Sequence, residues 1–402
     1  MKFLVIEQDL RVSGTSQGII SRSFLAKLRK SYPKAVIDVL YLKNLPSEDQ
    51  LHLLPVDAIE THIVNVKIPI ITKWLNKFYW RVFNASLQDK HIHKAYASYI
   101  VKVDYQKYNH IFVRSSGLEF ETILACKDLP ILKKAIINFH DPYPLFWYAG
   151  TLTKLTNLEL FRIKMMQTVV SQSKKCTSSA YAMAKDMEYL YGSRKKIYTL
   201  PHQYDASVFQ SFELKKRVEP AKKVIISYHG AIMFGRNVDL LLEAYSDLVE
   251  SNLAYKENTT FILRLRGDGI KNLISKYKKI ENIQILDCLD FYQSSYEQIH
   301  ETDITIILEN GPLYCNILVG KAPFLAEYKK PVLCISPQRS ELRNIIKEDQ
   351  FIANMNDKED IKLKLESLIK NRMTSKEPFS PFGDYFSDAT FKQMLDDVLN
   401  AQ

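Results

Sequence analysis

The chain has 402 residues, of which 46% are hydrophobic and 25% are charged. That length is too great for one ordinary hydrophobic core and suits two, and the composition is that of a soluble globular protein. The first apolar run, FLVI, ends before Glu7 and is too short for a secretory leader or a membrane span, so we expect a buried strand there. The five cysteines are scattered and form no C-x-x-C pair, which favours reduced thiols and a cytoplasmic protein.

The formal net charge of +10 lies in the first half of the chain. Residues 1–205 hold 29 Lys and Arg against 17 Asp and Glu, a balance of +12, whereas the remainder holds 26 against 28, a balance of −2. This asymmetry indicates that the first half meets an anion. The candidates are nucleic acid, an anionic bilayer surface and a phosphorylated lipid acceptor, and a basic surface that binds nothing is the remaining alternative.

Short apolar runs alternate with amphipathic segments in the first half, which is typical of β-α units around a parallel sheet. The loop after the first strand holds Gly14 and Gly18 among Ser and Thr residues, and such a loop lets backbone N–H groups approach a phosphate. An ordinary β-α turn would look similar. We predict strands at 3–7, 35–42, 110–115, 135–141 and 176–179, and helices at 24–32, 119–127 and 180–192.

The segment 67–90 departs from this rhythm because aromatic and basic residues alternate along it. Trp74, Lys77, Trp80 and Arg81 are among them. An interfacial helix needs this mixture, since rings lie at headgroup depth while cations meet anionic lipid. A membrane or acceptor contact is one interpretation, and a core-packing helix with a solvated basic face is the other.

His140 follows an apolar run in the segment NFHDPYP (138–144). Ligands of open α/β sheets bind beyond the carboxyl ends of the strands, where His140 would hydrogen-bond a sugar hydroxyl. A core or capping role is the alternative. The HIH run at 91–93 has no Cys or acidic partner and no D-x-D motif is present, so we expect no metal.

The second half repeats the β-α pattern after a polar segment, 200–223, which we predict to be a linker. The sequence thus predicts a second domain of the same architecture. Its elements are expected at 224–230, 237–250, 261–267, 283–288, 303–310, 322–330 and 331–336.

From residue 177 onward the sequence resembles a known protein family. The run 177–209, with Tyr191-Gly192, Pro201 and Asp205, resembles the end of the N-terminal domain in retaining GT-B glycosyltransferases of the glycogen synthase-like kind, also called glycosyl transferases group 1. His202-Gln203 replaces the Asn-Gly of that family. The resemblance implies two Rossmann-like domains that face each other across a cleft.

The run 227–245 resembles the family's opening strand, glycine loop and V-D-x-L-L-x-A helix. Two basic residues hold the donor pyrophosphate there in the family. Ala231 stands at the first of these positions, directly after Gly230, and Arg236 at the second. The resemblance therefore implies donor binding by Gly230 and Arg236, and a guanidinium suits the charge that builds on a departing diphosphate. The turn at Gly267 in RLRGDG resembles the family's Gly-Asp-Gly.

The run 308–333 departs further from the family, which has two Glu residues separated by seven others. Glu309 with Asn310 lies too far upstream for that spacing, and Glu327 lies one helical turn beyond the position of the second Glu. A family variant has a Lys ten residues before the proline of Lys-Pro-Val, and Lys321 stands there. The resemblance implies donor contacts from Lys321 and from one or both glutamates. The run 379–399 resembles the family's closing helix.

We therefore predict an α/β GT-B protein with an acceptor domain at 1–205, a nucleotide-sugar domain at 206–380 and a helix at 381–402 that returns to the first domain. The predicted function is metal-independent, retaining sugar transfer from a nucleotide-diphosphate sugar, without a cofactor, to a glycan or lipid-linked acceptor in bacterial cell-surface polysaccharide synthesis. Catalysis is assigned to His140, Arg236 and Lys321. A cytoplasmic protein peripheral to the inner membrane face is expected, and an epimerase, a phosphorylase or a basic nucleic-acid-binding protein are the alternatives.

Overall fold

The computed structural model forms two compact units. Unit 1 comprises Met1–Tyr148, Leu152–Phe209 and Ser387–Gln402, and unit 2 comprises Ala149–Thr151 and Gln210–Phe386. The change at Phe209 falls inside the predicted linker, of which residues 211–222 lie outside the described residues. The structure describes residues 1–47, 49–114, 120–144, 154–192, 195–210, 223–375 and 377–401.

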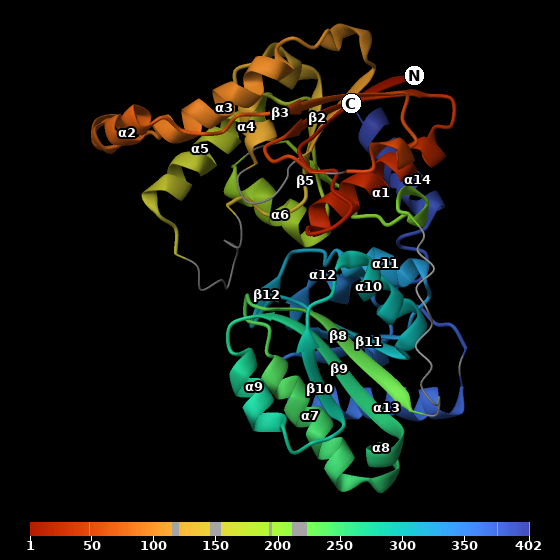
Figure 1. Ribbon diagram of the computed structural model, residues 1–402. Coiled ribbons are helices and arrows are strands. Elements are labelled where there is room, and N and C mark those ends of the chain that lie inside the picture. Colours follow the sequence, from red (N-terminus) through yellow and green to blue (C-terminus); the bar gives the residue numbers. More distant parts are fainter. Residues whose placement is uncertain are drawn as a thin grey trace. The chain divides into compact units, whose positions relative to one another are not determined.

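Unit 1 is built on a parallel sheet of seven strands in the order β3-β2-β1-β4-β5-β6-β7. The order reverses between β1 and β4, so the carboxyl ends of these two strands flank a topological switch point. Helices cover the sheet on both faces (Figure 1). The strands are β1 (Lys2–Glu7), β2 (Val36–Lys43), β3 (Ala58–Ile63), β4 (His110–Arg114), β5 (Ala135–Phe139), β6 (Lys175–Ser178) and β7 (Ile197–Thr199).

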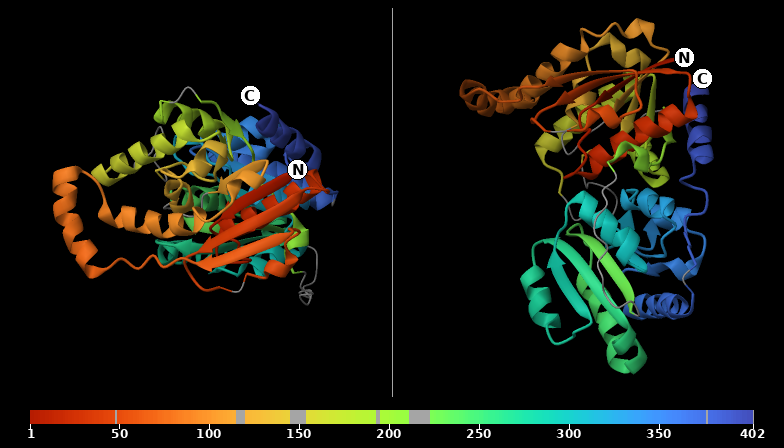
Figure 2. Two further views of the ribbon diagram at one scale, coloured as in Figure 1. Left: turned by 90° about the horizontal axis from the view of Figure 1, so that it is seen from above. Right: turned by 45° about the vertical axis from the view of Figure 1, so that its right-hand side comes forward.

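The helices of unit 1 follow the strands in the β-α pattern, and α2 stands out from the body of the unit (Figures 1 and 2). Among the described residues no helix is both long enough and apolar enough to cross a bilayer. The helices are α1 (Ser16–Ser31), α2 (Ile70–Phe83), α3 (Leu87–Ile100), α4 (Glu121–Ala125), α5 (Asn157–Gln172), α6 (Tyr181–Leu190) and α14 (Asp388–Asn400).

Helix α1 begins eight residues earlier than the sequence pattern predicts. The Thr15 hydroxyl accepts a hydrogen bond from the Gly18 backbone N–H, which caps the helix within the small-residue loop. A Cβ on Gly18 would lie 2.3 Å from the Arg11 carbonyl oxygen, so this glycine permits the close approach of helix and loop. Gly14 is exposed, with φ at +85°, and shapes the turn before the cap.

The C-terminal helix α14 packs on α1 inside unit 1 (Figure 2). Phe24 and Phe391 meet edge to face at 6.2 Å between ring centres, and Lys27 forms an ion pair with Asp388 at the start of α14. At its other end the Lys175 ammonium donates to the Val398 carbonyl at 2.7 Å, where a cation complements the helix dipole. The last turn of the chain is thereby attached to β6.

Unit 2 has a parallel sheet in the order β10-β9-β8-β11-β13-β15, with the reversal between β8 and β11. A short parallel pair, β12 (Tyr314–Cys315) and β14 (Arg339–Ser340), lies outside it. The main strands are β8 (Val224–Ile232), β9 (Thr259–Gly267), β10 (Ile283–Asp287), β11 (Ile304–Leu308), β13 (Val332–Ser336) and β15 (Ile352–Asn354). The helices are α7 (Val238–Ser251), α8 (Leu253–Asn258), α9 (Ile270–Tyr277), α10 (Phe291–Tyr296), α11 (Lys321–Glu327), α12 (Glu341–Ile345) and α13 (Lys358–Thr374).

Candidate functional site

The loops after β8 and β11 meet at the switch point of unit 2. The Gly311 N–H donates to the Phe234 carbonyl at 2.9 Å. Gly235 has φ at +76°, and a Cβ there would lie 2.6 Å from the Gly311 carbonyl oxygen, so only glycine fits. Arg236 follows, and its Nε donates to Asn310 Oδ1 at 3.1 Å. The two loops thus hold the Arg236 guanidinium where open α/β sheets bind ligands.

Lys321 is the first residue of α11 and lies near the same strand ends. Its Nζ is 5.8 Å from the centre of the Tyr228 ring on β8. A Cβ on Gly230 would lie 2.4 Å from the Tyr228 hydroxyl oxygen, so this glycine leaves the room that the ring occupies. The pKa of Lys321 is lowered to about 7, chiefly by burial and then by the charges of Arg236 and Arg266.

We call Arg236, Arg266 and Lys321 the cation cluster. In the part of the chain that the structure describes, no carboxylate forms an ion pair with any of the three. Arg236 and Lys321 are half-buried, and Arg266 is exposed at the end of β9 beside Gly267, whose φ is +116°. Like charges gathered at partly buried positions repel one another, so the cluster is suited to a polyanion.

A buried network beside the cluster includes residues that the sequence analysis missed. His229 Nδ1 is 2.9 Å from the Ser294 hydroxyl, and its Nε2 is 3.2 Å from Glu297 Oε1. Arg264 Nη2 lies 2.5 Å from Glu297 Oε2. Burial lowers the pKa of His229, and the charge of Lys321 lowers it further, which places the neutral imidazole next to the cluster. Glu297 opens a π-helical turn, a distortion frequent at functional sites.

The pKa of Glu297 shows how strongly this network is held. Burial alone would raise the pKa, but the hydrogen bonds from His229 and Arg264 outweigh it and lower the pKa to about 2. The carboxylate is therefore ionised and fixed in place by its two partners. The only local signal was His229 in SYHG, because its partners are separated from it by more than thirty residues.

The two predicted glutamates lie apart from the cluster. Glu309 is fully buried, and its Oε1 accepts from the Leu342 N–H at 3.4 Å. Burial raises its pKa to about 7, against hydrogen bonds from the Ser336 and Ser340 hydroxyls. Glu327 is exposed at the last residue of α11, whose first residue is Lys321, and a rise of about 1.5 Å per residue separates the two along the axis. The structure brings Asn310 to Arg236, and it brings neither glutamate there.

The switch point of unit 1 is occupied by a buried ion pair. Glu7 at the end of β1 and Arg114 at the end of β4 approach to 2.5 Å between Oε1 and Nε. Burial raises the pKa of Glu7 to about 7, although Arg114 and the Ser21 hydroxyl act in the opposite direction. The Arg114 guanidinium lies 3.9 Å above the Phe24 ring. A fixed positive group therefore stands where a Rossmann-like sheet binds ligands.

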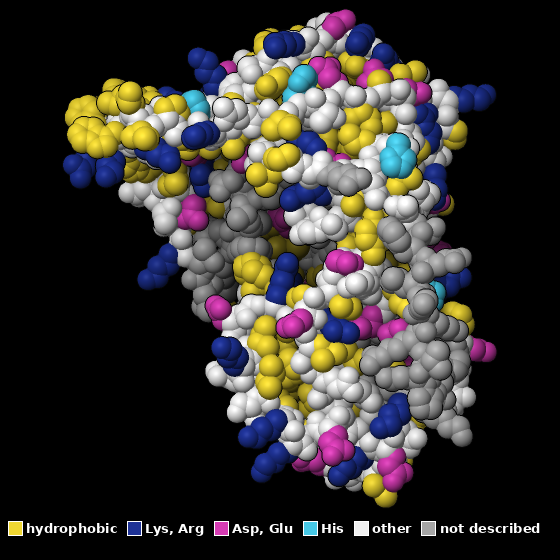
Figure 3. Space-filling view, viewed as in Figure 1, with side chains coloured by type: hydrophobic (Ala, Val, Ile, Leu, Met, Phe, Trp, Pro, Cys, Tyr) yellow, Lys and Arg dark blue, Asp and Glu magenta, His cyan; other side chains and the backbone are white. Residues whose placement is uncertain are grey.

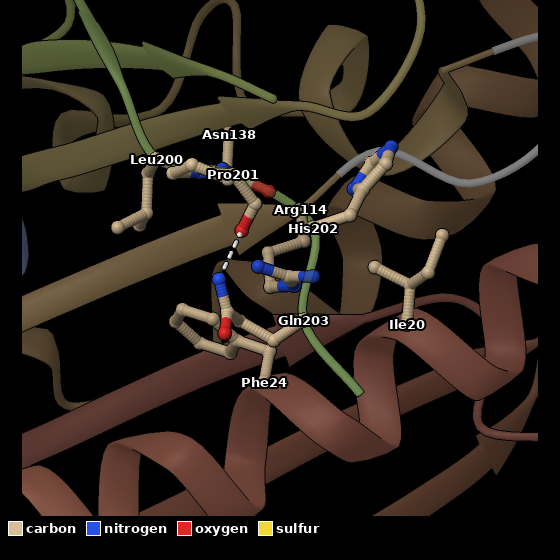
Figure 4. Close-up of a pocket in the computed structure, with 8 residues that line it drawn as sticks. All are labelled: Ile20, Phe24, Arg114, Asn138, Leu200, Pro201, His202 and Gln203. Carbon is tan, nitrogen blue, oxygen red and sulfur yellow. Dashed lines mark hydrogen bonds between the residues drawn. The ribbon is translucent and has the colours of Figure 1, made fainter. Parts of the chain in front are cut away.

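A small pocket opens beside this pair. His140 is buried directly after β5, and its ring centre lies 5.2 Å from that of His202. Burial, together with the charge of Arg114, holds the pKa of His140 well below its usual value. Gln203 Nε2 donates to the Pro201 carbonyl at 3.2 Å, as Figure 4 shows. The lining residues are Ile20, Phe24, Arg114, Asn138, Leu200, Pro201, His202 and Gln203.

Buried Arg22 of α1 anchors the segment that carries His202 and Gln203. Its Nη2 donates to the Val208 carbonyl at 2.8 Å and its Nη1 to the Leu10 carbonyl at 3.0 Å. The replacement of the family's Asn-Gly by His202-Gln203 thus places two polar side chains in the pocket wall. Within the described ranges, no group of three or more His, Cys, Asp or Glu residues is placed to hold a metal ion.

Comparison with solved structures identifies the architecture. The chain superposes on the Anabaena HepE protein in complex with UDP and glucose, with a TM-score of 0.65, 10% identity and complete coverage of both chains. UDP-GlcNAc 2-epimerase from Neisseria meningitidis, bound to UDP-GlcNAc, gives 0.58 at 12% identity, again with both chains fully covered. The lipopolysaccharide outer core galactosyltransferase WaaB gives 0.58 at 12% identity, with 99% of each chain covered. The chain has the GT-B fold.

A scan against known protein families gave no match, and neither did a search of curated proteins. The structural likeness at these identities establishes the fold of two Rossmann-like units and nothing more specific. It confirms the predicted α/β GT-B class. The residues at the two switch points remain the candidates for function on this GT-B chain, with the cation cluster in unit 2 and the Arg114 pocket in unit 1.

Proposed function

We propose that this chain is a glycosyltransferase that moves a sugar, with retention, from a nucleotide-diphosphate donor to a glycan or lipid-linked acceptor. The cation cluster carries the proposal. Arg236 and Arg266 lie at the carboxyl ends of β8 and β9, and Lys321 lies near them at the start of α11; none of the three has an acidic partner among the described residues. A pyrophosphate supplies the negative charge that this arrangement needs.

The proposed roles follow from where charge develops during the transfer. As the sugar departs, negative charge builds on the leaving diphosphate, and Arg236 and Lys321 stabilise it. Fixed guanidinium and ammonium groups can do this in place of a divalent ion, and the proposed chemistry needs no cofactor. Asn310 orients the guanidinium through its hydrogen bond to Arg236. His140, whose low pKa leaves the imidazole neutral, is proposed to hydrogen-bond a sugar hydroxyl.

Unit 1 is proposed to bind the acceptor, with its net positive charge favouring a phosphorylated one. The galactosyltransferase WaaB, which acts on the lipopolysaccharide outer core, lends support by likeness to a role in bacterial surface-glycan assembly at the cytoplasmic face. Nucleic acid is not among the proposed partners. Among the described residues no known DNA- or RNA-binding motif is recognised, and the basic residues are dispersed over unit 1.

Thermal unfolding with UDP-, GDP-, ADP- and CDP-sugars tests donor binding. A ligand at 100 times its dissociation constant adds about 2.7 kcal/mol of stability, which is a readily measured shift. Arg236→Ala is expected to abolish the shift, whereas Lys271→Met, an exposed lysine on α9, is expected to leave it unchanged. No shift with any donor would refute the proposal.

An epimerase is the second candidate, favoured by the likeness to the Neisseria meningitidis enzyme bound to UDP-GlcNAc. The two reactions differ in their need for an acceptor. An epimerase converts the nucleotide sugar alone into its epimer, whereas a transferase releases the nucleoside diphosphate in step with acceptor glycosylation. Chromatography of the products, with and without an acceptor glycolipid, separates the two.

A further inference from the structure

Helix α2 presents an apolar face that none of the described residues of unit 1 covers. None of its residues is buried. The exposed fractions of Ile70, Trp74 and Phe78 are 81%, 77% and 68%. Side chains at spacings of four residues share one face of a helix, so these three form a continuous ridge. The same face includes Ile71, Leu75 and Val82, all of them exposed.

The opposite side of α2 is fixed to unit 1 by a few specific contacts. Asn76 Oδ1 accepts from the Leu87 N–H at 2.7 Å, and the Tyr79 hydroxyl accepts from Lys90 Nζ at 2.7 Å. Trp80 meets Phe161 of α5 edge to face at 6.1 Å. Trp80, predicted as a surface contact, is thus half-buried against the unit. The alternative of a core-packing helix is wrong, because α2 contributes nothing to the core.

A basic stripe runs along one edge of the apolar face. Lys73, Lys77 and Arg81 recur every four residues and are all exposed. Figure 3 shows the apolar side chains gathered over α2 with Lys and Arg side chains beside them. Residues 61–88 contain no Asp or Glu. The surface of α2 is therefore apolar on one face and cationic along one edge of that face, and the segment that contains α2 has no acidic residue.

We propose that α2 docks on the surface of an anionic lipid bilayer, with the face of Ile70, Trp74 and Phe78 among the acyl chains and the basic stripe against lipid phosphates. Charge complementarity identifies this partner. A convex, isolated helix offers no groove to a peptide, whereas a bilayer accommodates a ridge, and each cation near an anionic surface adds to the attraction.

The orientation follows from the helix itself. Trp74 and Phe78 lie near the centre of the apolar face, so their rings enter to the level of the headgroup and acyl boundary. The contacts of Asn76, Tyr79 and Trp80 keep the axis of α2 attached to unit 1, which holds the unit at the membrane surface. The proposal uses none of the groups of the cation cluster, so its failure and that of the donor site are distinguishable.

Flotation of the full chain with vesicles tests the docking. We expect binding to vesicles of roughly three parts phosphatidylcholine to one part phosphatidylglycerol, and at least about tenfold weaker binding to phosphatidylcholine alone or in high salt. Trp74→Ser with Phe78→Ser is expected to reduce the partition at least about tenfold. The matched control, Leu253→Ser with Leu363→Ser, removes apolar side chains that are 68% and 65% exposed in unit 2 and is expected to change nothing.

Two further variants report on geometry. Lys73→Gln with Lys77→Gln and Arg81→Gln is expected to abolish the preference for anionic vesicles. In Trp74→Phe, which keeps an apolar ring, flotation is expected to persist while quenching of tryptophan emission by brominated acyl chains is lost. Absence of binding to anionic vesicles at low salt, unchanged flotation of the Ser variant, or capture of α2 in a dimer that light scattering detects would each overturn the proposal.

Discussion

Lys321 makes the donor site testable through pH. Its pKa, lowered to about 7 chiefly by burial and then by the charges of Arg236 and Arg266, means that the free protein carries the proton on about half of its molecules at neutrality. A pyrophosphate diester in a nucleotide sugar does not titrate near that pH. Donor binding that requires the ammonium form must therefore take up a proton, and its affinity must fall as the pH rises through about 7.

The size of the effect follows from the titration. With the pKa at about 7, the ammonium fraction drops about tenfold between about pH 6 and about pH 8, so the dissociation constant rises by up to about tenfold. Removing the group by Lys321→Met eliminates a charge-assisted contact worth about 1.5–3 kcal/mol, which weakens binding about 10- to 150-fold at about pH 6. The pH dependence is expected to flatten in this variant.

Isothermal titration calorimetry with a UDP-sugar in two buffers of different ionisation enthalpy measures both quantities. We expect an uptake of about half a proton at pH 7 for the unaltered chain and none for Lys321→Met. Lys271→Met serves as the control for the loss of a lysine from the surface of unit 2. Equal affinities at about pH 6 and about pH 8 in the unaltered chain, or an unchanged dissociation constant in Lys321→Met, would refute the reasoning.

Three further predictions concern stability and are read from urea unfolding. Glu297→Gln leaves Arg264 without its buried carboxylate and is expected to cost about 3 kcal/mol at neutral pH. Because the folded-state pKa of Glu297 is about 2, that contribution is present above its ordinary value of 4.5 and is lost as the pH falls toward 2, which acid titration of both proteins checks. Gly235→Ala places a Cβ against the Gly311 carbonyl at a positive φ and is expected to cost at least about 2 kcal/mol, an effect that equal urea midpoints would contradict. For Glu7 the folded-state pKa is raised to about 7, so its contribution to stability is expected to fall, by up to about 3 kcal/mol, as the pH rises from 4.5 to 7. Glu7→Gln should remove this part of the decline and leave the part due to Glu309, whose pKa is also raised to about 7.

Local pattern determined most of the regular structure of this chain. Apolar runs such as 3–7 and 303–310 are short, rich in β-branched residues and followed by amphipathic segments, and they became β1 and β11. The edge strand β3 escaped prediction because its residues, AIETHI, are largely exposed and carry no core pattern. It forms through parallel pairing with β2, from Ala58 opposite Asp38 to Ile63 opposite Lys43. Backbone hydrogen bonds to β2 therefore stabilise a strand whose own side chains show no core pattern.

The candidate sites divide in the same way. Arg236 and Lys321 could be chosen from sequence because each lies in a motif with a fixed spacing to glycine or proline. The connection of His229 to Glu297 and Arg264 depends on the register of β8 against β9, where His229 stands opposite Arg264, and on a turn sixty-eight residues away. The position of the Glu309 side chain likewise depends on another β-α unit, because its carboxylate accepts a hydrogen bond from the Leu342 backbone N–H.

Residue patterns along the chain were thus enough to predict the class of the fold, most of the buried strands and the cations Arg236 and Lys321, because each pattern is legible from neighbouring residues. Tertiary packing settled which side chains meet, because parallel strands join residues that the intervening helices separate along the chain. It also decided that the hydrophobic face of α2 is left in solvent. Hydrophobic periodicity predicts that a helix has an apolar face, but it does not predict which part of the protein, if any, packs against that face.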